Sequence, residues 1–249
     1  MPLAIDLFCG LGGWTDGMLA EGYDVIGFDI ERHVYGEHRY PAQLVIQDVL
    51  TLHGSQFRHA ALIVASPPCQ AYSYRAMPWS RAKALPPPDN SLFDACFRIQ
   101  REACESAGRH IPMVVENVRG AQKWVGRARW NFGSFYIWGD VPALMPINLG
   151  RQVMKAGIAH RSNGATNFHG YTKGEAQPSK GIKSDQGGWD RKVLRSSGRM
   201  VVGPSHGAAR KFASAMIAKI PETLSRHIAA TYLPKNKIAQ DLTPGRFSP

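Results

Sequence analysis

The sequence has few cysteines, and none of them falls in a pattern that would make a metal site or a disulfide framework. The four cysteines, Cys9, Cys69, Cys96 and Cys104, include no CxxC pair, and the nine histidines form no HxxxH or HExxH pattern. We therefore expect neither structural zinc nor a disulfide scaffold. Unpaired thiols of this kind suit a reducing cytoplasm.

Long apolar runs are missing as well. No stretch approaches the roughly 18 to 20 apolar residues that cross a bilayer. The first ten residues show no basic region followed by an apolar one. We therefore expect no membrane segment and no secretion signal, and we expect a cytoplasmic monomer. With 249 residues, the chain can bury one good core and a small second lobe.

Acidic residues are strongly outnumbered by basic ones in one segment of the chain. Residues 151–211 hold 12 Lys and Arg against 3 Asp and Glu, whereas residues 1–150 hold 13 against 14. Most of the net charge of +11 therefore lies in this glycine-rich segment. A phosphate polymer would bind there, because each neutralised phosphate releases counterions. A solvated basic tail fits the charge equally well.

Short apolar runs alternate with helix-like stretches in the first half of the chain. Strands are expected at residues 3–8, 24–29, 44–48, 61–66 and 112–117, and helices at 14–21, 31–39, 51–58 and 92–107. This alternation predicts an α/β fold with a doubly wound, mostly parallel sheet. Residues 1–150 would form this domain and residues 151–211 a small loop-rich basic lobe. Residues 212–249 would form a C-terminal helix that packs back on the sheet, then a tail.

A glycine turn follows the first expected strand, at the end where parallel sheets bind ligands. Its sequence is DLFCGLGG (residues 6–13), and the glycines would let a ligand approach the backbone. Asp29 lies 19 residues beyond Gly10, where a nicotinamide site has its ribose-binding acid, but Thr15 stands in place of the third glycine. The turn alone leaves both a nicotinamide site and an unliganded turn open.

Two further polar groups follow later strands. SPPCQ (residues 66–70) places Cys69 after two prolines, which would hold the thiol in one position as a nucleophile requires. Glu116 ends the fifth strand, where a buried carboxylate needs a hydrogen-bond partner or a proton. The glycine turn, Cys69 and Glu116 would then line one crevice.

DLFCGLGG, SPPCQ and ENV (residues 116–118), in this order, resemble the cytosine C5 DNA methyltransferase family over roughly residues 5–117. The resemblance implies a Rossmann-like domain that binds S-adenosylmethionine. Phe8 and Ile30 would cover the two faces of its adenine, and Asp48 would meet the adenine amino group. Asp29, with Glu31 as the alternative, would bind the ribose hydroxyls. The residues that would offer backbone to the cofactor are Gly10, Leu11, Gly12 and Pro68.

The resemblance also implies a mechanism. In this family a thiolate adds to C6 of a cytosine that has left the duplex stack, and C5 then takes the methyl group. Cys69 would be this nucleophile, and Glu116 would hydrogen-bond N3 and N4 or protonate N3. The family's Q-x-R-x-R motif is missing, and Arg127 and Arg129 would replace it. The late G-N-S/A-V-P element is also missing, and AKIP (residues 218–221) stands nearest to it.

Double-stranded DNA with a short target site is the implied partner. The aromatic and basic loop after Cys69 and the segment 151–211, in the place of the family's target recognition domain, would contact it. The candidate contacts are Gln70, Tyr72, Tyr74, Arg75, Arg161, Lys173, Lys180, Arg191 and Lys192. The short recognition segment resembles compact phage and prophage enzymes, which implies the cytoplasm of a bacterium or a phage-infected cell.

The predicted function is DNA cytosine-5 methylation. A tRNA cytosine-5 methyltransferase of the same family is an alternative, because basic charge does not separate DNA from RNA. A catalytically weakened DNA-binding relative is another, because the late element is eroded. A nicotinamide oxidoreductase is disfavoured by Thr15 and by the Pro-Pro-Cys loop.

Overall fold

The computed structural model describes residues 1–73, 86–146, 157–160, 166–169, 211–212, 215–216 and 218–234. Its main sheet has seven strands in the order β5-β2-β1-β6-β7-β9-β8. They are β1 (Leu3–Leu7), β2 (Asp24–Asp29), β5 (Gln43–Ile46), β6 (Ala60–Ala65), β7 (Met113–Asn117), β8 (Trp130–Phe132) and β9 (Phe135–Gly139). The first five strands in this order are parallel, and β9 is antiparallel to both neighbours. The predicted Rossmann-like, mostly parallel α/β sheet is confirmed.

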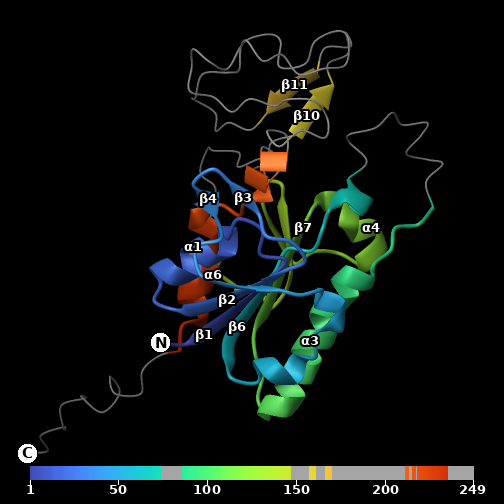
Figure 1. Ribbon diagram of the computed structural model, residues 1–249. Helices are drawn as coiled ribbons and strands as arrows, with labels where there is room; N and C mark the ends of the chain where they lie inside the picture. Colours follow the sequence, from blue (N-terminus) through green and yellow to red (C-terminus); the bar gives the residue numbers. More distant parts are fainter. Residues whose placement is uncertain are drawn as a thin grey trace, which may run out of the picture.

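Helices cover both faces of the sheet (Figure 1). On one face lie α1 (Gly13–Ala20) and α6 (Glu222–Tyr232), and on the other lies α3 (Ser91–Ala107) with the short 3-10 helices η1 (Val49–Thr51) and η2 (Gly54–Phe57). Side chains of a strand alternate between the faces, so Ala4 joins the α1 and α6 core while Ile5 and Leu7 join the α3 core. Two apolar cores thus hold the sheet in place.

The C-terminal helix α6 packs directly on α1. A side chain at Gly17 of α1 would place its Cβ 2.3 Å from Ser225 Oγ, so only glycine allows this approach. The Tyr23 hydroxyl donates to the carbonyl of Ala229 at 3.0 Å. α6 begins at Glu222, after Pro221. Proline there fixes the first turn, because its missing N–H would be unpaired in a helix start anyway.

Two of the expected helices are wrong. Residues 31–39 form a hairpin of β3 (Val34–Tyr35) and β4 (His38–Arg39), because Gly36 takes φ 63 and turns the chain. Residues 51–58 form no α-helix but run from the end of η1 through η2. Gly54 lies against α3 so closely that a Cβ would be 2.0 Å from the carbonyl oxygen of Ile99, and this approach interrupts regular helix.

The remaining described elements are short. They are η3 (Gln70–Tyr72), η5 (Arg119–Ala121), α4 (Gln122–Val125) and the antiparallel pair β10 (Gly157–His160) and β11 (Thr166–His169). Most of residues 147–210 lie outside the described residues, so the division at residues 150 and 211 stays a prediction. Within the described ranges, no helix could span a membrane and no group of three or more side chains could hold a metal ion.

Candidate active site at the carboxyl ends of the strands

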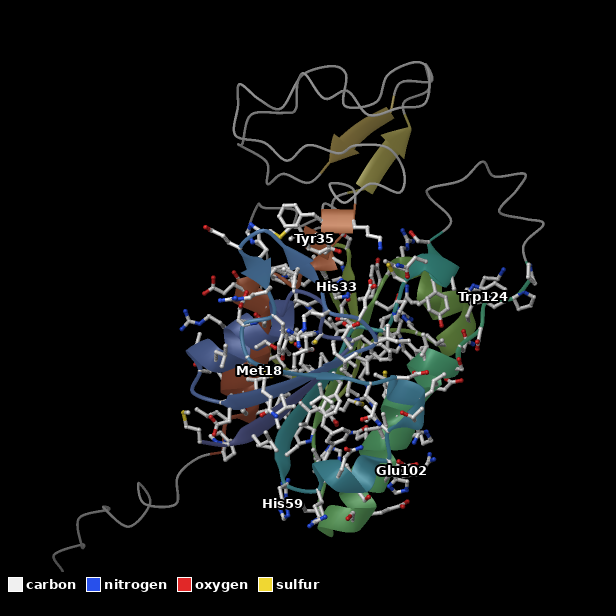
Figure 2. All side chains as sticks on the ribbon, in the orientation of Figure 1. Met18, His33, Tyr35, His59, Glu102 and Trp124 are labelled. Atoms are coloured by element: carbon white, nitrogen blue, oxygen red, sulfur yellow. The ribbon has the colours of Figure 1, made fainter. Side chains whose placement is uncertain are left out.

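Five parallel strands end at one edge of the sheet. Leu7 of β1 lies opposite Phe28 of β2 and Ala65 of β6. Ala65 in turn lies opposite Val115 of β7. The residues that follow these strands therefore lie side by side, as expected for a ligand site in an open α/β sheet. In Figure 2, His33, which follows β2, lies at this end of the molecule.

The glycine turn after β1 has a left-handed backbone. Phe8 takes φ 59, and Gly10 and Gly12 take φ 51 and φ 76. A bulky residue rarely adopts such a conformation, and strain of this kind gathers at ligand sites. A Cβ on Gly12 would lie 2.5 Å from Pro41 Cδ, so this position requires glycine for space as well as for its dihedral angle. Leu11 between them is buried, and Phe8 is half-buried.

A buried hydrogen-bonded network lies beneath this turn, and the sequence did not indicate it. The Thr15 hydroxyl donates to Asp6 Oδ2 at 2.6 Å, and the Tyr40 hydroxyl lies 2.6 Å from Thr15 Oγ1. Burial raises the pKa of Asp6 to about 7, although the bond from Thr15 lowers it. The signal was Thr15 itself: a hydroxyl in the place of a glycine has to find a partner when it is buried.

Asp29, the expected ribose ligand, ends β2 beside the turn. Its Oδ2 accepts from the N–H of Gly10 at 2.9 Å, and its Oδ1 lies 3.5 Å from His33 Nε2. Burial raises the pKa of Asp29, but the hydrogen bonds from His33 and from the N–H groups of Gly10 and Glu31 lower it more, so the net shift is downward. The carboxylate is thus held ionised and oriented. No signal in the sequence indicated this contact between His33 and Asp29.

Three other expected cofactor contacts lie at the same edge. Asp48 follows β5, is half-buried and accepts from the N–H of Leu50 at 2.9 Å. Ile30 is 70% exposed. Pro68 is exposed, whereas Pro67 before it is buried. These positions offer an acceptor and apolar surface around an open edge of the sheet.

Cys69 differs from the other three cysteines in its surroundings. Cys9 and Cys96 are buried, and burial strongly raises the pKa of both thiols, which makes them poor nucleophiles. Cys104 is half-buried and accepts from the N–H of Ile111 at 3.2 Å. Cys69 is half-buried on the proline loop rather than in a packed core, and its carbonyl accepts from the N–H of Tyr72 at 3.0 Å.

The end of β7 is bonded directly to the proline loop. Asn117 Nδ2 donates to the carbonyl of Pro67 at 3.0 Å, and Asn117 Oδ1 accepts from the N–H of Val118 at 2.8 Å. Glu116, beside Asn117, is only 2% exposed. The bond from Asn117 to Pro67 therefore adds to the pairing of β6 with β7 in joining the segments that carry Cys69 and Glu116.

Of the residues just after Cys69, Gln70 faces outward and Tyr72 faces the core. Gln70 is exposed and, with Pro68 and Leu92, helps to line a pocket between the loop and the start of α3. Tyr72 is 3% exposed and its hydroxyl donates to Asn90 at 2.9 Å. The structure thus corrects the expectation that Tyr72 faces DNA, because a ring packed in the core cannot stack on a base.

Arg127 and Arg129 are both exposed beyond β7. Between Glu116 and Asp140 the sequence has four cations and no acid. None of these cations forms a salt bridge among the described residues. Gln122 Oε1 accepts from the N–H of Ala128 at 3.2 Å and so holds the backbone between the two arginines. Trp124, labelled in Figure 2, belongs to α4 and lies within this segment.

Residues 218–221, the nearest counterpart of the family's missing G-N-S/A-V-P element, pack on α1, the helix that follows the glycine turn. A Cβ on Gly13 would lie 2.3 Å from the backbone nitrogen of Ile220, and Lys219 Nζ lies 2.6 Å from Asp16 Oδ2. The segment therefore lies against the helix that follows the glycine turn, without the residues of the family's late element. The predicted contacts that lie outside the described residues are Tyr74, Arg75, Arg161, Lys173, Lys180, Arg191 and Lys192.

Comparisons with solved structures give three methyltransferases among the similar chains. A DNA modification methyltransferase encoded in a prophage of E. coli is 25% identical to this chain. The match covers 50% of this chain and 34% of the prophage protein, with a TM-score of 0.36. The Dnmt2 methyltransferase of S. pombe has 16% identity, 49% and 36% coverage and a TM-score of 0.32. The Entamoeba histolytica methyltransferase EhMeth has 15% identity, 60% and 56% coverage and a TM-score of 0.37.

This chain spans only about a third of the length of the first two proteins, and no curated protein matches the sequence. The fold assignment rests on the strand order above, since all three TM-scores are low. The family model of the C-5 cytosine-specific DNA methylases matches residues 3–123, which include the glycine turn, the proline loop and the end of β7. Residues 3–123, which carry the described site, are therefore similar to the C-5 cytosine-specific DNA methylases.

Proposed function

We propose that the protein transfers a methyl group from S-adenosylmethionine to C5 of a cytosine in double-stranded DNA. The family match supports the reaction class. The observation that carries the proposal is the bond between Asn117 and the carbonyl of Pro67, because it links the proline loop of Cys69 to the strand end of Glu116. A nucleophile and a carboxyl group on two bonded segments can act on one base.

The residues around the glycine turn fit S-adenosylmethionine. The ligand has a ribose diol that needs acceptors, an adenine that needs apolar faces, and a cationic methionine end. Asp29 is held with a lowered pKa beside the turn, and the exposed side chain of Ile30 adjoins it. The left-handed backbone at Phe8 and Gly10 opens the turn to a ligand. When bound, the cofactor supplies an electrophilic methyl group.

The chain's own residues then prepare the base. The Cys69 thiolate adds to C6, and the electron pair of the C5–C6 double bond moves into the ring, where Glu116 hydrogen-bonds N3 and N4 or donates a proton to N3. C5 becomes nucleophilic enough to take the methyl group. Removal of the C5 proton by a base restores the double bond and expels Cys69. The cytosine has to leave the stack, at a cost of roughly a few kcal/mol, to reach this site.

A duplex that contains 5-fluorocytosine tests the proposal, because fluorine at C5 cannot leave as a proton and traps the Cys69 adduct. We expect a covalent, cofactor-dependent adduct with the wild type and none with Cys69→Ser. Cys104→Ser is the matched control, since Cys104 is also half-buried. DNA and cofactor affinity of Cys69→Ser should stay within about an order of magnitude of the wild type, because the thiol acts in covalent chemistry.

Parallel methyl-transfer assays on duplex DNA and on tRNA separate the two substrates. Methylation of tRNA alone would replace DNA as the substrate. DNA binding without any adduct would show a binding protein instead of an enzyme. Bisulfite sequencing of DNA from cells that express the protein would then give the target site.

A further inference from the structure

Ser66 is the first residue after β6, and it is bonded to both sides of the glycine turn. Its N–H donates to the carbonyl of Leu7 at 3.2 Å, and Leu7 comes directly before the turn. Its Oγ accepts from Trp14 Nε1 at 3.0 Å, and Trp14 lies just beyond the turn in α1. One residue therefore closes the glycine turn from the side of the proline loop.

The donor in this contact is fixed in place. Trp14 is 2% exposed and belongs to the core that α1 and α6 share, together with Met18, Ile220 and Leu224. A hydrogen bond in such an apolar surrounding is stronger than one in water, and its loss leaves a buried N–H. The Ser66 hydroxyl is thus held by a rigid partner rather than by a mobile surface group.

Ser66 is also stiffly joined to the nucleophile. Pro67 and Pro68 separate it from Cys69, and each proline ring fixes its own φ. The carbonyl of Pro67 accepts from Asn117 Nδ2, next to Glu116. A displacement of Ser66 therefore moves the thiol, because few dihedral angles between the two residues can absorb it.

We propose that Ser66 is a positioning residue that couples the state of the glycine turn to the placement of the Cys69 thiol. A methyl donor bound at the turn would orient the thiol through Trp14, Leu7 and Ser66. This inference rests on the proposed function, because it assumes that the turn binds the cofactor and that Cys69 is the nucleophile.

Two variants remove the side-chain bond from either end. Ser66→Ala loses the acceptor but keeps the backbone hydrogen bond from its N–H to the carbonyl of Leu7. Trp14→Phe loses the donor but keeps an aromatic ring in the core. We expect kcat to fall roughly threefold to tenfold in each, the size of one neutral hydrogen bond, with KM for the cofactor changed less than about twofold. The double variant should be no slower than the slower single one, because both changes remove the same bond.

Tyr23→Phe is the matched control. It also removes one buried hydrogen bond near α1, from the Tyr23 hydroxyl to the carbonyl of Ala229, but away from the glycine turn. It should lower the melting temperature without changing kcat. If Ser66→Ala and Trp14→Phe behave like this control, with a lower melting temperature and an unchanged kcat, Ser66 has a structural role only and the inference is overturned.

A second readout needs no DNA. S-adenosylhomocysteine is added, the protein is treated with iodoacetamide, and mass spectrometry follows the alkylation of Cys69. In the wild type we expect the added compound to change the Cys69 rate, and in Ser66→Ala we expect this change to disappear while the compound still binds by calorimetry. An equal change in both proteins overturns the inference. A wild type that binds the compound but methylates no nucleic acid overturns the proposed function, and the alkylation result still decides the coupling.

Discussion

The two halves of the strand-end edge are built from different chemistry. On the side of β1, β2 and β5, the polar groups are the carboxylates of Asp6, Asp29 and Asp48, and each accepts at least one hydrogen bond from a neighbouring residue. On the side of β6 and β7 stand a thiol and a buried carboxyl group, followed by a segment with four cations and no acid. Hydrogen-bond acceptors therefore dominate the side of β1, β2 and β5, and cationic side chains dominate the side of β6 and β7.

This difference matches the two ligands of the proposed reaction. A ribose diol and a cationic methionine end need acceptors, and a nucleic acid needs cations for its phosphates. The halves are joined at Ser66, which bonds the start of the proline loop to Trp14 and Leu7 on either side of the glycine turn. Asn117 bonds that loop to β7 within the second half. Changes in one half should therefore affect one ligand much more than the other.

The largest such effect is expected at Glu116. Glu116→Gln removes the proton donor and charge from the side of β7, and methyl transfer should fall by roughly 10² to 10⁴. S-adenosylhomocysteine affinity, measured by calorimetry, should not change. Glu105→Gln, on the exposed surface of α3, is the control and should keep full activity. An equal loss of cofactor binding in Glu116→Gln would break the division between the halves.

Asp29 should show the opposite pattern. Asp29→Asn removes a charged acceptor from the cofactor side and should weaken S-adenosylhomocysteine binding roughly 10- to 100-fold, the range for hydrogen bonds to charged groups. DNA affinity should be unaffected. Asp24→Asn lies at the other end of the same strand, is exposed and serves as the control. Unchanged cofactor binding in Asp29→Asn, with weaker DNA binding, would contradict the assignment.

The salt dependence of DNA affinity tests whether Arg127 and Arg129 contact phosphates. The double change to alanine should lower the slope of log affinity for DNA against log salt by about 2, one for each phosphate contact. Cofactor affinity should stay the same. Arg58 and Arg101 are also exposed and lie away from the carboxyl ends of the strands, so their double change should leave the slope intact. Equal slopes for the two double variants would exclude phosphate contacts by Arg127 and Arg129.

Asp6 should affect stability while DNA binding is preserved. Its pKa is raised from 3.8 to about 7, so Asp6 stabilises the fold fully below pH 3.8 and loses this contribution as the pH rises through 7. The free energy of unfolding of the wild type should therefore fall relative to Asp6→Asn over this range, by on the order of a few kcal/mol. Denaturant unfolding at about pH 5 and about pH 8 measures it. Parallel curves for the two proteins would show that Asp6 does not titrate.

Much of the fold could be predicted from local pattern. The five parallel strands are short apolar runs that end in polar residues, and each expected range agrees with the structure to within two residues. The hairpin at residues 34–39 could not be predicted, because its alternative, a helix, has similar local propensities and is excluded by the turn at Gly36 and the burial of Tyr40. The 3-10 helices η1 and η2 depend on contact with α3, which is distant in sequence.

The site was predictable where it consists of motifs and not where it consists of contacts. Cys69, Glu116 and Asp29 could be proposed from the sequence because each ends or follows an expected strand, and their roles stay predictions. The contacts of His33 and Ser66 could not be predicted, because a histidine or a serine gives no signal until its partner is known. Tyr72 was misplaced for a related reason: an aromatic residue in a basic loop can face solvent or the core, and only packing decides.

The sequence by itself determined the order of motifs along the chain and the chemistry that each can carry, because residue type and spacing are local properties. Only the tertiary structure decided which motifs are bonded to one another. Trp14 reaches Ser66 across 52 positions, and Asn117 reaches Pro67 across 50. Such contacts depend on strand order and on the packing of α1 against the sheet, which no single stretch of sequence specifies.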